Sequence, residues 1–499
     1  MKQNEFERVA PEEVGIASEN IEWLLDKLES GITEPHGLMI MRHGKICAEG
    51  WWAPYSSEIR HGMQSHTKTY AATAIGIACT EGILSLEEKI ADIFAEEAKG
   101  VTSEKLKEIT VHDVLCMGCG MEYEPEINEN WIQNFLHVPV KHTPGEQFMY
   151  NTTGSTLLGA IICKKTGENL QEYLTKRLFS KIGICADNIR WLYMPDGLEL
   201  GGAGIFARTE DNLRLMKLYA DNGMWNGERI LSSDYIKRAT TKQIDTKSES
   251  RVNPEKYDNF EGYGYQIWMC KRKGAYRADG ALGQFTIVVP DLDMIIAITE
   301  NAEGSHWTQQ VLDIIWEFLD KISVEEKKLH VGEKAEKLKH RLDSLSLPAP
   351  KISSCFLRGW EEKKTYEIKE GLLQFEYYGG VLPALGRKAP EEIKRFTLEQ
   401  KEQFAQILYE TVAGDKKFTV DMSGGRKWEI LGVDVPNEVL ASGYWETDTV
   451  FVLELRWIET CDTNTYRFRF EENECLIDWK RNELFSMKHY NAKAERVIG

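Results

Sequence analysis

Ser65-His66-Thr67-Lys68 opens the most distinctive segment of this chain, because a long run of small and apolar residues, Thr69 to Cys79, follows it. Ser65 is the only serine in the sequence with a lysine three positions downstream. The composition of the run predicts a buried helix. Residues three apart share one helix face, so we expect the Ser65 hydroxyl and the Lys68 amine to meet at the helix N-terminal end.

This pairing has the elements of nucleophilic catalysis. A serine needs a base to become a nucleophile, and a lysine is such a base when burial lowers its pKa. Backbone N–H groups at a helix N-terminus also favour the negative charge of an oxyanion. A serine and a lysine at this spacing also arise by chance. A lysine on a helix that is apolar nearly all round, however, has few roles other than a functional one.

Composition restricts the function classes. The formal net charge is −18 over 499 residues, and the acidic residues are spread along the chain. This charge argues against partners such as nucleic acid or an anionic membrane surface. No stretch is long and apolar enough to cross a bilayer. The first residues, Met1 to Arg8, are polar and lack the apolar segment of a signal peptide, so we expect a cytoplasmic protein.

Cysteine usage fits that expectation. The 10 cysteines are scattered and include one C-x-x-C pair, Cys116 and Cys119, with no second pair or histidine cluster to complete a zinc site. We expect reduced thiols, no metal and no cofactor.

Hydrophobic patterns predict an α+β domain over residues 1–324. An amphipathic helix lies within residues 1–30, and a hairpin over residues 37–50 turns at His43-Gly44. Helical segments dominate residues 68–240. The remaining predicted elements are strands over 263–269, 283–290 and 294–299 and a closing helix over 307–319. Together they predict one antiparallel sheet flanked by helices, with an additional helical section.

A second domain is expected after a linker. Residues 325–351 are rich in Glu and Lys and end in Pro348-Ala349-Pro350, which predicts a solvated helical linker. Apolar and polar residues then alternate over 450–457 and 466–470, as in half-buried antiparallel strands. We therefore predict a β-rich C-terminal domain over residues 352–499, with one helix over 391–413.

Two further motifs complete a pattern with Ser65-x-x-Lys68. The first is the segment from His142 to Thr152, which contains Tyr150 and precedes a second apolar helix. The other is Ala278-Asp279-Gly280-Ala281-Leu282-Gly283-Gln284 at the start of a strand. In order and spacing the three motifs resemble the serine β-lactamase and penicillin-binding-protein-like hydrolases. The resemblance is to the class C-like branch, which includes DD-peptidases, D-aminopeptidases, esterases and nylon-oligomer hydrolases, and it covers roughly residues 10–320.

The resemblance implies a role for each motif. Ser65 would be the acylated nucleophile, and Lys68 its base. Tyr150 would assist proton transfer to the leaving group and activate the deacylating water. The backbone N–H groups of Ser65 and Ala281 would form the oxyanion hole.

Two positions depart from the family pattern. Thr152 replaces an asparagine and can still hydrogen-bond a substrate amide. Ala278 replaces the Lys or His that opens the third motif, which removes a cation that binds substrate carboxylates and favours neutral esters or amides. Arg277 is adjacent, but strand alternation points it to the other face. Asp279 either lines the site and contacts substrate or makes a structural hydrogen bond.

Aromatic residues are candidates for a hydrophobic acyl pocket, although most tryptophans are simply core residues. We expect one or two of the following to line the site: Trp51, Trp52, Trp131 and Trp268.

The sequence thus predicts a serine hydrolase that forms an acyl-enzyme on Ser65 and hydrolyses a small ester or amide. Two alternatives remain: a D-aminopeptidase- or β-lactamase-type amidase, and a non-catalytic penicillin-binding-like sensor that is acylated once. The role of the C-terminal domain and the formation of a homo-oligomer are left open.

Overall fold

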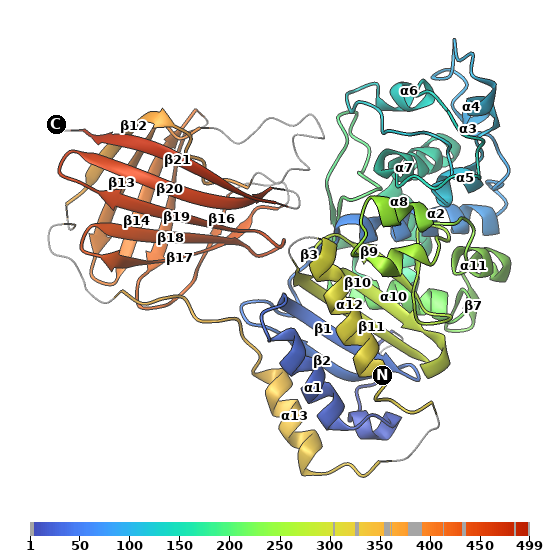
Figure 1. The fold of residues 1–499 in the computed structure, drawn as a ribbon, viewed down its shortest axis with the longest axis horizontal. Helices are drawn as coiled ribbons and strands as arrows, with labels where there is room; N and C mark the ends of the chain where they lie inside the picture. The colour runs from blue at the N-terminus through green and yellow to red at the C-terminus, as the bar shows by residue number, and fades with distance from the viewer. Residues whose placement is uncertain are drawn as a thin grey trace. The chain divides into compact units, whose positions relative to one another are not determined.

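The computed structural model describes residues 4–302, 305–324, 329–353, 360, 362–377, 392–412, 414–431, 436–483 and 486–497. Contacts within the chain divide it into two compact units, Met1–Leu345 and Ser346–Gly499. Figure 1 shows the first unit in blue to yellow and the second in orange to red. The division falls inside the segment 325–351, and each unit is described by itself below.

A six-stranded antiparallel sheet organises the first unit, with strand order β2-β1-β11-β10-β9-β8. The strands are β1 Glu34–Arg42, β2 Lys45–Trp51, β8 Trp268–Met269, β9 Tyr276–Gly280, β10 Gln284–Val289 and β11 Met294–Asn301. The predicted hairpin is confirmed: His43 and Gly44 connect β1 to β2 with φ angles of 52° and 72°. Positive φ at both central residues is the requirement of a tight hairpin turn. Pairing of β1 with β11 joins the two ends of this unit.

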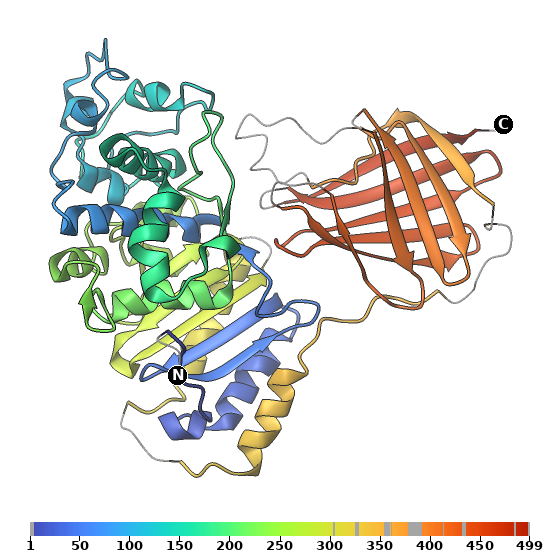
Figure 2. The same ribbon diagram turned by 180° about the vertical axis from the view of Figure 1, so that it is seen from behind.

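Helices cover both faces of this sheet, as the α+β prediction required. Helix α1 (Ser18–Leu28) packs against α12 (Ser305–Leu319), and α12 crosses in front of the sheet in Figure 1. Helix α10 (Thr209–Ala220) contacts β1, β10 and β11 from the other side, which faces the viewer in Figure 2. In the described part of the chain, no helix combines the length and apolar content needed to cross a bilayer.

The helical section is built around α2 (Thr67–Thr80), nearly all of whose side chains are buried. Helix α7 (Thr152–Thr166) lies against it. The other helices of this section are α3 Ile90–Ile93, α4 Glu104–Glu108, α5 Val111–Leu115, α6 Trp131–Leu136, α8 Leu170–Leu174, α9 Ser180–Ile182 and α11 Ser233–Ala239. Short strands β3 His61–Gly62, β4 Arg190–Trp191 and β5 Ile205–Ala207 form a small sheet beside them.

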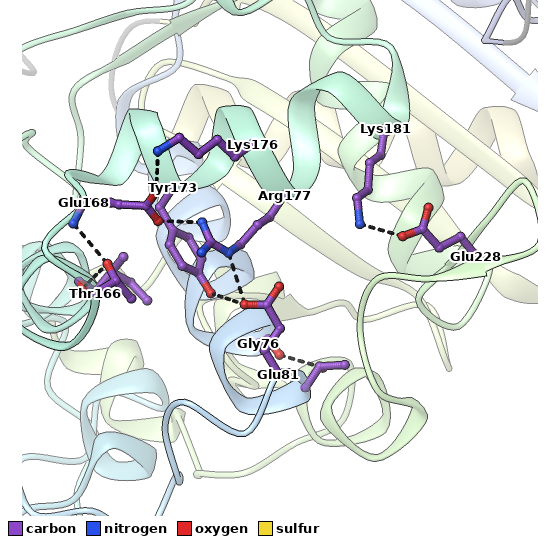
Figure 3. A network of polar contacts seen from close by, with 11 residues as sticks. Gly76, Glu81, Thr166, Glu168, Tyr173, Lys176, Arg177, Lys181 and Glu228 are labelled. Carbon is purple, nitrogen blue, oxygen red and sulfur yellow. Dashed lines mark hydrogen bonds and ion pairs between the residues drawn. The ribbon is translucent and has the colours of Figure 1, made fainter.

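A polar cluster holds the C-terminal end of α2. Glu81 follows the last helical residue and accepts a hydrogen bond from Arg177 Nε at 3.1 Å. The same guanidinium donates to Glu168 at 2.6 Å, and the Tyr173 hydroxyl lies 3.4 Å from Glu81 (Figure 3). One arginine therefore joins α2 to the segment that follows α7, at the opposite end of α2 from Ser65.

Two local predictions need correction. The predicted strand over 263–269 is reduced to Trp268–Met269, because Gly264 N bonds to Ile267 O in a turn and Gln266 adopts a positive φ of 56°. The segment 325–351 is also more than a solvated connection. Its helix α13 (Glu333–Asp343) buries Leu338 and Leu342 and contacts α1 and β2, so its charged residues cover only the outer face.

The second unit is one antiparallel sheet of ten strands, in the order β15-β14-β13-β12-β21-β20-β19-β18-β17-β16. The strands are β12 Lys364–Gly371, β13 Arg395–Lys401, β14 Phe404–Thr411, β15 Gly414–Asp421, β16 Lys427–Ile430, β17 Glu438–Thr447, β18 Val450–Trp457, β19 Thr463–Phe470, β20 Glu474–Glu483 and β21 Ser486–Arg496. Because β15 contacts β16 and β17, the sheet nearly closes around an aromatic core. The predicted β-rich domain is confirmed.

The helix predicted over 391–413 is wrong. This segment forms the hairpin β13–β14, and its buried residues alternate along each strand, as in Phe396 and Leu398 and then Ile407 and Tyr409. Glu, Lys and Gln residues fill the exposed positions and suggested a helix. The period-two burial of apolar residues outweighed that composition.

Substitution of Gly76 tests the packing of α2. An added Cβ would lie 2.5 Å from Tyr235 of α11. We expect Gly76→Ala to destabilise the protein by about 1–3 kcal/mol in urea unfolding, the usual cost of overpacking, although alanine is the better helix former. In a Tyr235→Ala background the same change should cost less, although Leu231 Cδ2 would still lie 2.7 Å from the added Cβ. An equal cost in both backgrounds would contradict the close approach of α11 to α2.

Candidate active site

Ser65 lies in a 3-10 turn, Gln64–His66, that leads directly into α2. Gln64 adopts a left-handed backbone conformation with φ of 49°, which is unusual for a residue with a side chain. Thr67 stabilises this turn, because its hydroxyl donates to Gln64 O at 2.5 Å and accepts from Ile205 N at 3.1 Å. The serine is thus presented on a constrained turn at the predicted end of the helix.

Lys68 lies one turn further along and contacts three oxygen atoms. Its Nζ is 3.0 Å from Ser65 Oγ, 3.3 Å from Thr152 Oγ1 and 2.6 Å from the carbonyl oxygen of Gly202. The Gly202 carbonyl can only accept, so it takes one N–H of the amine. A neutral amine has a second N–H for Thr152 and a lone pair that accepts the Ser65 hydroxyl proton. The three contacts therefore suit both protonation states: an ammonium donates to all three oxygens, and a neutral amine donates to two and accepts from Ser65.

The surroundings of Lys68 favour that neutral form. The side chain is 1% exposed, and burial lowers its pKa from 10.5 to about 7. The carboxylates of Glu124 and Asp279 partly oppose this effect, because negative charge nearby favours the ammonium form. Near neutral pH a substantial fraction of Lys68 is therefore able to accept a proton.

Tyr150 approaches the same serine from the segment before α7. Burial raises the pKa of its phenol by more than the interaction with the Ser65 side chain lowers it, so the group stays protonated near neutral pH. Its ring stacks on Trp268 with a centroid separation of 5.9 Å. Lys68 Nζ lies 4.7 Å from the centroid of the Tyr150 ring.

Of the tryptophans considered for the site, Trp268 is the one in contact with Tyr150. Trp52 and Trp131 instead donate to Glu29 and Asp196.

Glu124 positions the start of α7. Its carboxylate accepts from Thr152 N at 3.0 Å and from Thr153 N at 2.7 Å, and these are unpaired donors of the helix end. Asn151 accepts from Gly154 N at 2.6 Å and is 2% exposed, so its side chain caps the helix. These contacts leave the Thr152 hydroxyl beside Lys68.

The third motif forms the end of β9 and the loop after it. Gly280 approaches the segment before Ser65 so closely that a Cβ would lie 2.2 Å from Met63 O. This approach brings Ala281, the next residue, to the same end of the sheet as Ser65. Ala278 is fully buried and pairs with Thr286, whose hydroxyl lies 2.9 Å from His66 Nε2.

Asp279 is engaged by two cations. Its carboxylate accepts from Lys256 Nζ at 3.1 and 3.2 Å and from Arg277 Nε at 2.8 Å. Burial raises the pKa of this carboxyl, but Lys256 and Arg277 outweigh burial and hold it below its usual value. These contacts within the protein correspond to the structural hydrogen bonding that was one of the two roles considered for Asp279.

One group of side chains has the composition of a metal site. His112, Asp113 and Cys116 place one ligand atom each within 4.8 Å of one another. His112 Nδ1 is already 2.8 Å from the Tyr265 hydroxyl, and Asp113 accepts from Thr110 N at 2.8 Å as a helix cap. These contacts account for two of the three side chains as structural groups of α5.

Three site residues were not identified from sequence. Gly202 contributes only a backbone carbonyl, and its small size is needed because a Cβ would lie 2.4 Å from Thr152 O. Glu124 and Lys256 lie in irregular segments far from the motifs in sequence. The Gly201-Gly202 pair was the one available signal, since adjacent glycines often mark a close backbone approach.

Solved structures of other proteins align with this chain. A presumptive beta-lactamase from Bacteroides dorei aligns with a TM-score of 0.50 and 14% identity, over 62% of this chain and 99% of its own. A presumptive 6-aminohexanoate-dimer hydrolase from Bacillus anthracis aligns with a TM-score of 0.49 and 20% identity, over 64% and 88%. An octameric penicillin-binding protein homologue from Pyrococcus abyssi aligns over 95% of this chain and 99% of its own, with a TM-score of 0.47 and 15% identity.

A family model described as Beta-lactamase matches residues 36–316, which is more than half of the chain. The match begins within β1, ends within α12 and includes the three motifs. The chain therefore belongs to the beta-lactamase family.

Proposed function

We propose that this protein is a serine hydrolase that forms an acyl-enzyme on Ser65 and hydrolyses a small ester or amide. The observation that carries the proposal is the contact of Lys68 Nζ with Ser65 Oγ at 3.0 Å, in surroundings that favour a neutral amine. Membership in a family of hydrolases supports the general class.

Acylation begins with transfer of the Ser65 proton to Lys68. The lone pair of the neutral amine faces the hydroxyl, so Ser65 Oγ becomes nucleophilic as it attacks the substrate carbonyl. The new ammonium remains bonded to Thr152 and Gly202. Negative charge develops on the carbonyl oxygen, which the backbone N–H groups of Ser65 and Ala281 would stabilise.

Tyr150 completes the cycle. Its phenol is protonated near neutral pH, so it can donate a proton to the departing alcohol or amine and recover one from Lys68. In deacylation the same groups act in reverse: they remove a proton from water, which attacks the acyl carbonyl and releases Ser65. Two buried groups thus pass one proton between them: an amine whose pKa is lowered and a phenol whose pKa is raised.

The first experiment replaces the nucleophile. Ser65→Ala should abolish turnover of a p-nitrophenyl ester and labelling by a fluorophosphonate, since loss of a nucleophile normally costs several orders of magnitude. Ser57→Ala, at an exposed position, is the matched control and should behave as wild type. Residual activity within about tenfold of wild type would disprove the assignment. A single stoichiometric burst without turnover would instead support the acylated sensor.

Lys68→Ala and Tyr150→Phe test the proton transfer. Each should lower kcat by about a hundredfold or more, the usual scale of general acid–base catalysis. The double variant should lose less than the product of the two effects, because the groups act as one unit. Unchanged turnover in Tyr150→Phe would remove Tyr150 from the mechanism.

The pH dependence tests the state of Lys68. Its neutral form is the base, so kcat/KM should rise with pH through a midpoint of about 7. Glu124 stabilises the ammonium form and raises the pKa of Lys68, so Glu124→Gln should move this midpoint to lower pH. A glutamine also retains one acceptor for the cap of α7. A midpoint that stays in place, or moves to higher pH, would argue that another group controls the profile.

A further inference from the structure

Two cations and one carboxylate meet beside the third motif. Lys256 reaches Asp279 from a loop, and Arg277 reaches it from two residues earlier on β9. All three side chains are buried, and Arg277 is fully so. The remaining Arg277 contacts are to uncharged groups, including Asn259 Oδ1 at 2.5 Å and Met269 O at 3.3 Å. The carboxylate of Asp279 is thus the anion in direct contact with both cations.

This cluster lies at the candidate active site. Asp279 immediately precedes Gly280 and Ala281, the residues brought to Ser65 by the close approach at Met63. Its charge acts on both Lys68 and Tyr150. Strand β8 pairs with β9 only at Arg277 and Tyr276, so the edge of β9 at Asp279 lies beyond the end of its neighbour. The cluster also retains some contact with solvent, because the Lys256 side chain is 11% exposed.

The charge of the cluster has a consequence for ligands. Lys256 and Arg277 carry two positive charges; Asp279 supplies the negative charge in direct contact with them, and the charge of Asp258 acts on both without a direct contact. Burial of a charge is unfavourable unless it is paired, so each cation needs an anionic neighbour. Asp279 gives both cations the same partner and accepts three hydrogen bonds, as a bound substrate carboxylate would.

We propose that Asp279 is a specificity-determining residue: its carboxylate occupies an anion site formed by Lys256 and Arg277 and excludes substrates that carry a carboxylate there. The proposal rests on the proposed hydrolase function and names its substrate class as neutral esters or amides. Ala278 supplies no cation, whereas Lys256 and Arg277 supply two beside the third motif and share the Asp279 carboxylate as their direct anionic partner. Removal of the Asp279 carboxylate should open the site to an external carboxylate.

Matched esters test the proposal. Mono-p-nitrophenyl succinate differs from p-nitrophenyl butyrate by a terminal carboxylate in place of a methyl group. Wild type should favour the butyrate ester, and Asp279→Ala should shift the ratio of kcat/KM values toward the succinate ester by about tenfold or more, the scale of one charge-assisted hydrogen bond. Asp279→Asn, which keeps the shape, should shift the ratio in the same direction. The control is the double variant Asp279→Ala with Lys256→Met, which should lose most of the gain.

Thermal melting supplies a readout that does not depend on catalysis. Sodium formate resembles the deleted carboxylate, and a ligand that binds only the folded state raises Tm. Formate should raise the Tm of Asp279→Ala relative to sodium chloride at equal ionic strength, and should have no such effect on wild type or the double variant. If Asp279→Ala does not fold, refolding of this variant in formate but not in chloride is the expected result.

The outcomes separate the two hypotheses. An unchanged ester ratio in both single variants, together with no formate effect on Tm, would overturn the role of Asp279. Absence of ester turnover and of Ser65 labelling in the wild type would overturn the hydrolase function. In that case the formate-dependent Tm shift still decides whether Lys256 and Arg277 form an anion site.

Discussion

The burial of the Lys68 amine is the interaction on which the rest of the site depends. A lysine in water carries a proton and cannot act as a base near neutral pH. Here the helical section removes the Lys68 amine from water, and the Gly202 carbonyl accepts one of its N–H groups. Thr152 takes a second, and the Ser65 hydroxyl faces the remaining position. Each of these partners comes from a different part of the chain, so the site exists only when the first unit is folded.

The sheet explains how such distant segments meet. Strand β9 brings the third motif to the turn that carries Ser65, and only glycine at position 280 permits that approach. On the opposite side, Glu124 holds the start of α7, and thereby Thr152, against Lys68. The two carboxylates whose charges raise the pKa of Lys68, Glu124 and Asp279, each have protein donors as partners. Their charge therefore adjusts the pKa of Lys68 while their oxygen atoms fix the backbone or the adjacent cations.

Much of this could be predicted from sequence where local chemistry decides the structure. The small apolar residues after Lys68 indicated a buried helix, His43-Gly44 indicated a hairpin turn, and three motifs indicated the family. Other features depend on tertiary contacts that no local pattern records. Strand alternation places Arg277 and Asp279 on one face, but Lys256 reaches Asp279 from a loop, and no local pattern indicated that contact. The β13–β14 hairpin was missed because its exposed residues have the composition of a helix.

Turnover through an acyl-enzyme requires that substrate be attached covalently to Ser65. Rapid quenching of the enzyme with a p-nitrophenyl ester in acid, followed by proteolysis and mass spectrometry, detects this directly. The peptide containing Ser65 should gain the mass of the acyl group, and fragmentation should assign that mass to Ser65. The adduct should form and decay at rates consistent with kcat. An enzyme that turns over the ester with no acylated peptide at any quench time, or with the acyl group on another residue, would contradict the acyl-enzyme route.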